Sequence, residues 1–103
     1  MSEEKNPNQL NIELTEQVAE GIYSNLAIIV HSSSEFVIDF ARIVPGVPKA
    51  PVKSRIIMTP ENAKRLLHAL NENIIKFEKT NGKIRNQGKQ IIPLNFGGPT
   101  PEA

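Results

Sequence analysis

The chain has 103 residues, 39% of them hydrophobic, no cysteine and a formal net charge of +1. This length fits one small domain, and the absence of cysteine excludes disulfides, thiol nucleophiles and thiolate metal ligands. No segment approaches the roughly 20 apolar residues of a membrane helix, and the N-terminal residues lack the pattern of a signal peptide, so we expect a cytoplasmic protein with no membrane partner.

The first predicted element is a strand over residues 9–14, which follows a flexible arm at residues 1–8. Leu10, Ile12 and Leu14 alternate with polar residues there, as in a half-buried strand. The next predicted feature is a helical turn with Thr15 as its cap and a left-handed exit at Gly21. We expect this turn to act only as a connector.

Three further strands are predicted at residues 22–31, 35–44 and 52–58. The polar turn Ser32-Ser-Ser34 joins the first two of them as a hairpin. Three prolines between residues 45 and 51 cannot donate to a β-ladder, so this stretch is predicted to be a stiff loop. Short connections between antiparallel neighbours then predict a four-stranded meander.

A capped helix is predicted from Pro60 to Asn81. Thr59 suits the cap, Pro60 the first helical position, and Gly82 the exit. One apolar stripe follows the helical spacing i, i+3, i+4, i+7 and should pack on one face of the sheet: Ala63, Leu66, Leu67, Leu70, Ile74 and Phe77.

The predicted fold class is therefore α+β: a four-stranded antiparallel β-meander followed by one long C-terminal α-helix packed on one face. Residues 9–85 form the single domain, and residues 86–103 form a flexible or loosely docked tail.

Apolar residues are also expected on the sheet face that the helix does not cover. They form the candidate self-association face: Ala27, Ile29, Val37, Ala41, Ile43 and Ile57. Because one helix covers one face only, these side chains would lie in water unless something buries them. A second copy related by a twofold axis is the simplest cover, so we expect a homodimer built through this face or an exposed sheet edge. Fold-back of the apolar residues 91–96 is the intramolecular alternative.

Charge is divided unevenly along the chain. Residues 1–41 carry a net charge of −6 and residues 42–103 a net charge of +7, a division that suits self-association or an anionic partner if the two parts occupy different faces. If folding interleaves the two parts, the separation of negative from positive charge is lost. The candidate anion or nucleic-acid contacts are Lys49, Lys53, Lys64, Arg65, Lys76, Lys79, Lys83, Arg85 and Lys89. Aromatic stacking platforms for single-stranded nucleic acid are scarce.

No group of residues predicts catalysis, a metal site or a cofactor. His31 and His68 lack the spacing of a metal motif. His31 with the nearby serines and Asp39 contains the residue types of a catalytic triad, but the glycine-flanked nucleophile turn is missing. We instead expect Asp39 to form a structural ion pair with Arg55, which would set the strand register.

Several stretches resemble one small bacterial family known only as a domain of unknown function, DUF3467. The resemblance covers residues 10–85 and is carried by Asn11-Ile-Glu-Leu-Thr, Ala19-Glu-Gly-Ile-Tyr-Ser-Asn-Leu-Ala-Ile, His31-Ser, Glu35-Phe-Val-Ile-Asp-Phe and Ser54-Arg-Ile-Ile-Met-Thr-Pro-Glu-Asn-Ala-Lys-Arg-Leu-Leu. It implies no activity and no catalytic residues. The strand and helix order is similar to Whirly and purine-rich-element single-strand-binding modules in layout alone.

The expected function is thus that of a non-catalytic interaction or assembly module that forms a homo-oligomer. A second protein is also considered as its partner. The alternative is a nucleic-acid-binding protein that uses the basic helix face and the C-terminal tail.

Overall fold

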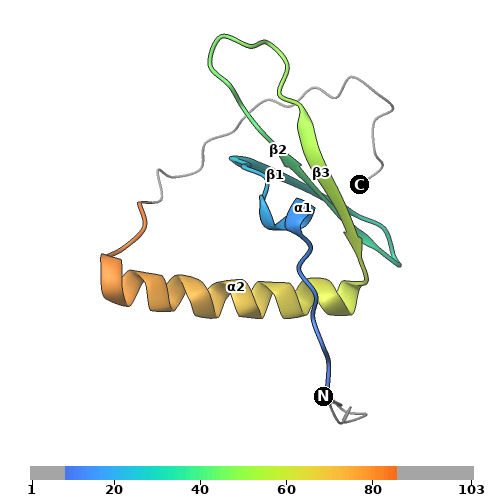
Figure 1. The fold of residues 1–103 in the computed structure, drawn as a ribbon, viewed down its shortest axis with the longest axis vertical. Helices are drawn as coiled ribbons and strands as arrows, with labels where there is room; N and C mark the ends of the chain where they lie inside the picture. Colours follow the sequence, from blue (N-terminus) through green and yellow to red (C-terminus); the bar gives the residue numbers. More distant parts are fainter. Residues whose placement is uncertain (1–8, 86–103) are drawn as a thin grey trace.

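The computed structural model describes residues 9–85 of the chain. A helical turn α1 (Glu16–Ala19) precedes three strands, β1 (Leu26–His31), β2 (Phe36–Ala41) and β3 (Val52–Met58), and a long helix α2 (Pro60–Asn81) follows them. The strands form one antiparallel sheet in the order β1-β2-β3 (Figure 1). The α+β class and the meander are confirmed. The domain assignments at residues 1–8 and 86–103 lie outside the described residues.

The prediction of a fourth strand at residues 9–14 is wrong. The described sheet has three strands, and residues 9–15 have no regular secondary structure. Alternation of apolar and polar residues describes a side-chain pattern, but a strand also needs a neighbouring backbone for its hydrogen bonds. In this chain no neighbour within the described part supplies them, and the three apolar side chains of the segment are exposed.

The first strand of the sheet begins later than predicted, because polar side chains hold the chain ahead of it. The Asn25 side chain donates from Nδ2 to the carbonyl of Ile43 (3.1 Å) and accepts at Oδ1 from the Ile43 amide (2.7 Å). The Ser24 hydroxyl donates to the carbonyl of Ala41 (2.9 Å). One backbone bond, from the Asn25 amide to the carbonyl of Ala41 (3.1 Å), still precedes β1, and side chains make the other contacts there. The predicted strands at residues 22–31 and 35–44 are therefore shorter than expected.

A four-residue turn sets the register of the β1–β2 hairpin. The Ser32 amide donates to the carbonyl of Glu35 (2.9 Å), and the Ser32 hydroxyl accepts from the amides of Ser34 and Glu35 (both 3.2 Å). His31 consequently lies opposite Phe36, and Ile29 lies opposite Ile38. Directly opposed residues share a face of the sheet, so Ile29 and Ile38 point to the same side.

Helix α2 begins and ends where the sequence predicts. Thr59 is extended (φ −71°, ψ 156°) and its hydroxyl accepts from the amide of Asn62 at 3.2 Å, with Pro60 at the start of the helix. Gly82 follows the last turn with φ of 88°, which a side-chain-bearing residue rarely adopts. The predicted capped helix is therefore confirmed.

Replacing Thr59 with Ala should lower the unfolding free energy by about 1 kcal/mol, because an N-terminal amide of α2 loses its acceptor. Thr59→Asp keeps an acceptor oxygen and is the matched control. Chemical denaturation followed by circular dichroism measures both variants. An equal loss in the two variants would contradict a capping role for the hydroxyl.

The core within residues 9–85 is small. Ile38 and Ala41 are its buried hydrophobic residues, and both belong to the central strand β2. The sheet and α2 leave their junction at Thr59 in diverging directions, with the strands rising away from the helix (Figure 1). The prediction that α2 packs its apolar stripe on the sheet is therefore met only near that junction.

Candidate interaction surface

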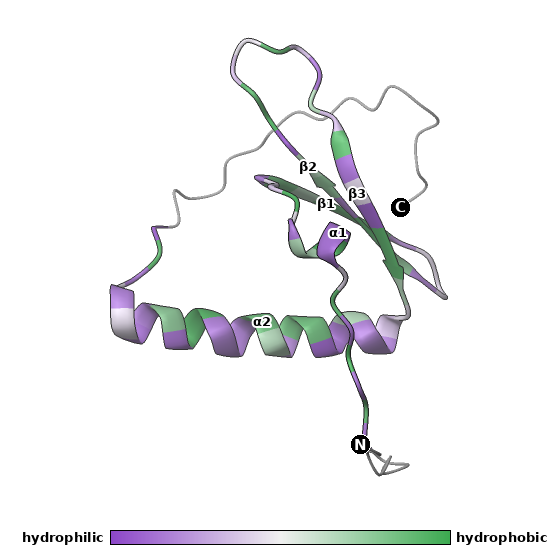
Figure 2. Ribbon diagram, viewed as in Figure 1, coloured by the Kyte–Doolittle hydropathy of each residue, from purple (hydrophilic) through white to green (hydrophobic). Residues whose placement is uncertain are grey.

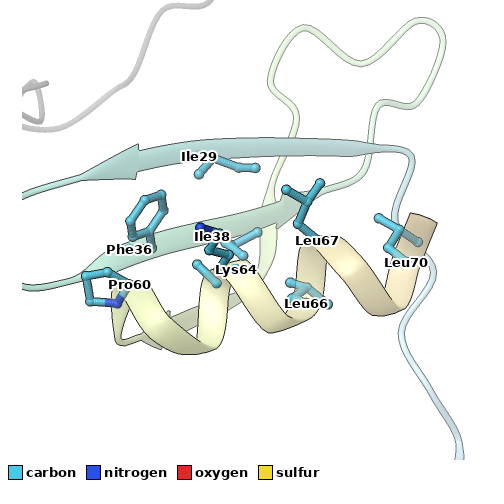
Figure 3. Close-up of a pocket in the computed structure, with 9 residues that line it drawn as sticks. Ile29, Phe36, Ile38, Pro60, Lys64, Leu66, Leu67 and Leu70 are labelled. Carbon is cyan, nitrogen blue, oxygen red and sulfur yellow. The ribbon is translucent and has the colours of Figure 1, made fainter. Parts of the chain in front are cut away.

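An apolar groove opens between the sheet and the first half of α2. Its volume is about 500 Å³. Figure 3 shows the side chains that line it. Its lining comes from Ile29, Phe36 and Ile38 of the sheet and from Pro60, Ala63, Lys64, Leu66, Leu67 and Leu70 of the helix. The lining is almost wholly hydrocarbon, so the groove is suited to bury apolar side chains and offers little to recognise a polar ligand.

The apolar stripe of α2 lies largely in water. No residue of the helix is buried; Leu67 is 61% exposed and Leu70 is 55% exposed. Ile74 and Phe77 continue the stripe beyond the groove and are also exposed. Figure 2 shows hydrophobic residues recurring along α2 and concentrated in the strands. The helix therefore presents an amphipathic face that its own sheet covers only in part.

The six residues predicted to form one self-association face do not share a face. The strand register places Ala27 and Ile29 on the helix side with Ile38, whereas Val37, Ala41 and Ile57 lie on the opposite side. The predicted face is wrong for β1: it joins Ala27 and Ile29 with Val37, whereas the register joins them with Ile38, one residue further along β2. Because side chains alternate with a period of two, that slip exchanges the two faces of a strand. Ile43 follows β2 and is partly exposed.

On the face away from α2, Asp39 and Arg55 form the predicted structural pair. The Arg55 guanidinium donates from Nε to Oδ1 at 2.7 Å and from Nη2 to Oδ2 at 2.8 Å. Asp39 is 3% exposed, while Arg55 is largely exposed. These hydrogen bonds and the positive charge of Arg55 lower the pKa of Asp39, and they outweigh the desolvation that would raise it. The pair joins β2 to β3, and both oxygens of the buried carboxylate accept a hydrogen bond from Arg55.

The basic residues are spread over several elements. Lys49 lies in the loop before β3 and Lys53 lies in that strand, whereas the four basic residues of α2 are Lys64, Arg65, Lys76 and Lys79. Glu61 and Glu72 intervene on the same polar side of the helix, and Arg65 Nη2 lies 3.6 Å from Glu61 Oε1. Lys83 and Arg85 follow α2, and Lys89 lies outside the described residues. The structure therefore shows a mixed-charge helix face.

Two aromatic side chains, Phe36 and Tyr23, contact other ring or guanidinium groups. The His31 and Phe36 rings are stacked with centroids 5.3 Å apart, at the end of the groove where Phe36 lines it. The Arg42 guanidinium lies over the Tyr23 ring, 5.6 Å from its centroid. Sequence reasoning missed the groove residues Phe36 and Pro60 as surface-forming groups. The apolar stripe was visible in the sequence, but its exposure was not.

Within residues 9–85, no three His, Asp or Glu side chains gather as a metal site would require. In the same range, neither helix combines the length and the apolar character of a membrane span.

Comparison with known proteins identifies one family. The family model described as Protein of unknown function (DUF3467) matches residues 1–86, which is most of the chain and agrees with the resemblance seen in the sequence. Neither the curated proteins nor the solved structures contain a significant match.

Proposed function

This chain belongs to the DUF3467 family of proteins of unknown function, and we propose that it is a non-catalytic assembly module that works as a homodimer. In the dimer, the groove and the apolar stripe of α2 of one copy are buried against a second copy. The observation that carries this proposal is a 22-residue amphipathic helix of which no residue is buried.

Energetic reasoning supports burial of this surface. Helices gain most of their stability from packing an apolar face, and α2 packs little of its apolar face against the sheet of its own chain. Each square ångström of apolar surface removed from water contributes about 25 cal/mol. A specific interface needs about 800 Å² from each partner. The groove together with the stripe from Leu66 to Phe77 supplies a contiguous apolar surface along most of the helix, which suits such an interface.

The shape and the charge of the surface favour a second copy as the partner. The groove is a hollow and the adjoining stripe is a ridge, so a twofold axis can place the ridge of each copy in the hollow of the other. Residues 9–41 contain five acids and no Lys or Arg, whereas residues 42–85 contain ten bases and three acids. Copies that bring these two parts together gain from their opposite charges.

Light scattering of the full chain at tens of micromolar should give twice the 11.4 kDa chain mass. A monomer at that concentration would contradict the proposal. Ile29 and Ile57 provide a matched pair of positions, since they are 58% and 57% exposed but lie on opposite faces. Ile29→Asp should break the dimer because Ile29 lines the groove, and Ile57→Asp should leave it intact. The reverse ranking would move the interface to the other face.

Nucleic-acid binding is the second candidate, and the ten bases of residues 42–85 are the observation in its favour. Phosphate contacts make affinity fall steeply with salt concentration. A fluorescent single-stranded oligonucleotide would then bind at low salt, release at moderate salt, and bind less tightly to the Lys83→Glu, Arg85→Glu variant. Absence of binding at low salt would exclude this function.

A further inference from the structure

The segment of residues 9–14 has the side-chain pattern of a strand and no partner in the described chain. Leu10, Ile12 and Leu14 alternate with polar residues, and all three are exposed, Ile12 to 87%. A segment with three apolar side chains on one side is stabilised when it lies beside another strand, which pairs with its backbone and helps to bury those side chains. The segment is therefore a candidate strand that lacks a sheet.

Strand β1 offers the matching free edge. Within residues 9–85 the strand order leaves β1 and β3 at the two edges of the sheet. Strand β3 carries the edge protections found in natural sheets: Lys53 and Arg55 within it, Pro51 before it, and a register irregularity opposite its start. Strand β1 is Leu-Ala-Ile-Ile-Val-His, with no Lys, Arg, Asp, Glu or Pro. It is the unprotected edge and the better template for an added strand.

The segment and the edge also match in length and in chemistry. Both comprise six residues. When residues 9–14 pair with β1 so that Ile12 points to the groove side, Leu10 and Leu14 join Ala27 and Ile29 there. Asn11 and Glu13 then point to the other side. The added strand extends the apolar lining of the groove toward the part of α2 that its own sheet does not cover.

The path of the chain directs this pairing to another molecule. Thr15 caps α1, its hydroxyl accepting from the amide of Val18 (3.3 Å) and its carbonyl from the amide of Ala19 (2.8 Å). From α1 the segment runs across α2 and away from the three strands in the view of Figure 1. The outer edge of its own β1 thus has no strand beside it within residues 9–85, while the segment extends outward, as in donated strands of other assemblies.

We propose that residues 9–14 of one copy pair with the free edge of β1 of a second copy and complete a four-stranded sheet across the dimer. This inference rests on the homodimer proposed above and specifies which backbone segments the two copies exchange. Each copy both donates and accepts a strand, so the exchange closes on a dimer under twofold symmetry.

Disulfide trapping tests the exchange directly, because the natural chain has no cysteine. One full-length chain carries Leu10→Cys, Ile12→Cys or Leu14→Cys, and the other carries Ala27→Cys. After mixing and mild oxidation, at least one of the three should form a disulfide between different chains, since neighbours in a strand pair bring their Cβ atoms close enough. Asn11→Cys and Glu13→Cys are the controls and should not link to Ala27→Cys, because they face the other side.

The outcomes separate this inference from the dimer itself. A dimer by light scattering that forms no such disulfide overturns strand exchange and leaves the groove interface standing. A monomer overturns both. A disulfide within one chain that carries both cysteines, with none between chains, shows that the segment pairs with its own β1 and overturns the exchange.

A second measurement does not depend on cross-linking geometry. Ile12→Glu should weaken dimerisation by about 100- to 10,000-fold, because each of the two copies loses one buried aliphatic side chain. Asn11→Glu adds the same charge one residue away and should leave the dimer affinity unchanged. Equal effects of the two substitutions in analytical ultracentrifugation would overturn the proposed orientation of the strand.

Discussion

Leu67→Asp is expected to convert the proposed dimer into a monomer at micromolar concentration. Leu67 lines the groove and is exposed in the single chain, so the proposed interface buries it in both copies. A fully buried leucine contributes about 1.5 to 3 kcal/mol. Both copies of a twofold dimer lose this contribution, so the dissociation constant should rise roughly 100- to 10,000-fold. Burial of the new carboxylates would weaken the dimer further.

His68→Asp is the matched control for this change. His68 is the neighbouring residue on the polar side of α2 and is exposed, so it receives the same added carboxylate outside the proposed interface. Analytical ultracentrifugation gives the dissociation constants, and circular dichroism checks that α2 stays helical. Equal dissociation constants for Leu67→Asp and His68→Asp would show that the stripe of α2 takes no part in assembly.

Asp39→Asn is expected to lower the unfolding free energy by about 1.5 to 3 kcal/mol, the range for hydrogen bonds to a charged group. Asp39 is buried at the centre of the sheet and accepts two short hydrogen bonds from Arg55. The asparagine keeps the size of the side chain but loses its charge and one of its acceptor oxygens. Glu35→Gln is the control, because Glu35 is exposed in the turn before β2. Urea unfolding of the two variants measures the difference, and equal midpoints would contradict a stabilising pair.

The same pair predicts a direction for acid sensitivity. Arg55 holds the pKa of Asp39 below its ordinary value of 3.8 in the folded protein. In the unfolded chain Asp39 therefore takes up its proton at a higher pH than in the folded state. The contribution of the pair to stability is complete above about pH 5 and is lost as the pH falls through the lowered pKa. Unfolding free energies measured from pH 6 to pH 2 should decline less steeply for Asp39→Asn. An unchanged decline would contradict this assignment.

The caps and the ion pair show which features follow from local sequence. Thr59, Pro60 and Gly82 bound α2 because capping depends on residues within one turn of each other. Asp39 and Arg55 meet because adjacent antiparallel strands bring opposed residues together, and the pattern of the two strands already implied that they are neighbours. Such features need no knowledge of the rest of the molecule.

The faces of the sheet were harder to predict, as Ala27 and Ile29 show. Both faces of β1 are apolar, so its pattern alone does not say which residues point to the helix. The four-residue turn decides it by placing His31 opposite Phe36. The candidate interface consequently moves from the face away from α2 to the groove beside it, and only Ile29 of the six predicted residues lines that groove.

By itself, the sequence determined the capped helix, the antiparallel order of the last three of its four predicted strands, and the polar pair between β2 and β3, because short-range geometry governs each of them. Tertiary structure alone decided that α2 diverges from the sheet and that residues 9–14 have no strand beside them. An apolar pattern records that a surface avoids water, and the identity of the surface that covers it depends on where distant segments of chain come together.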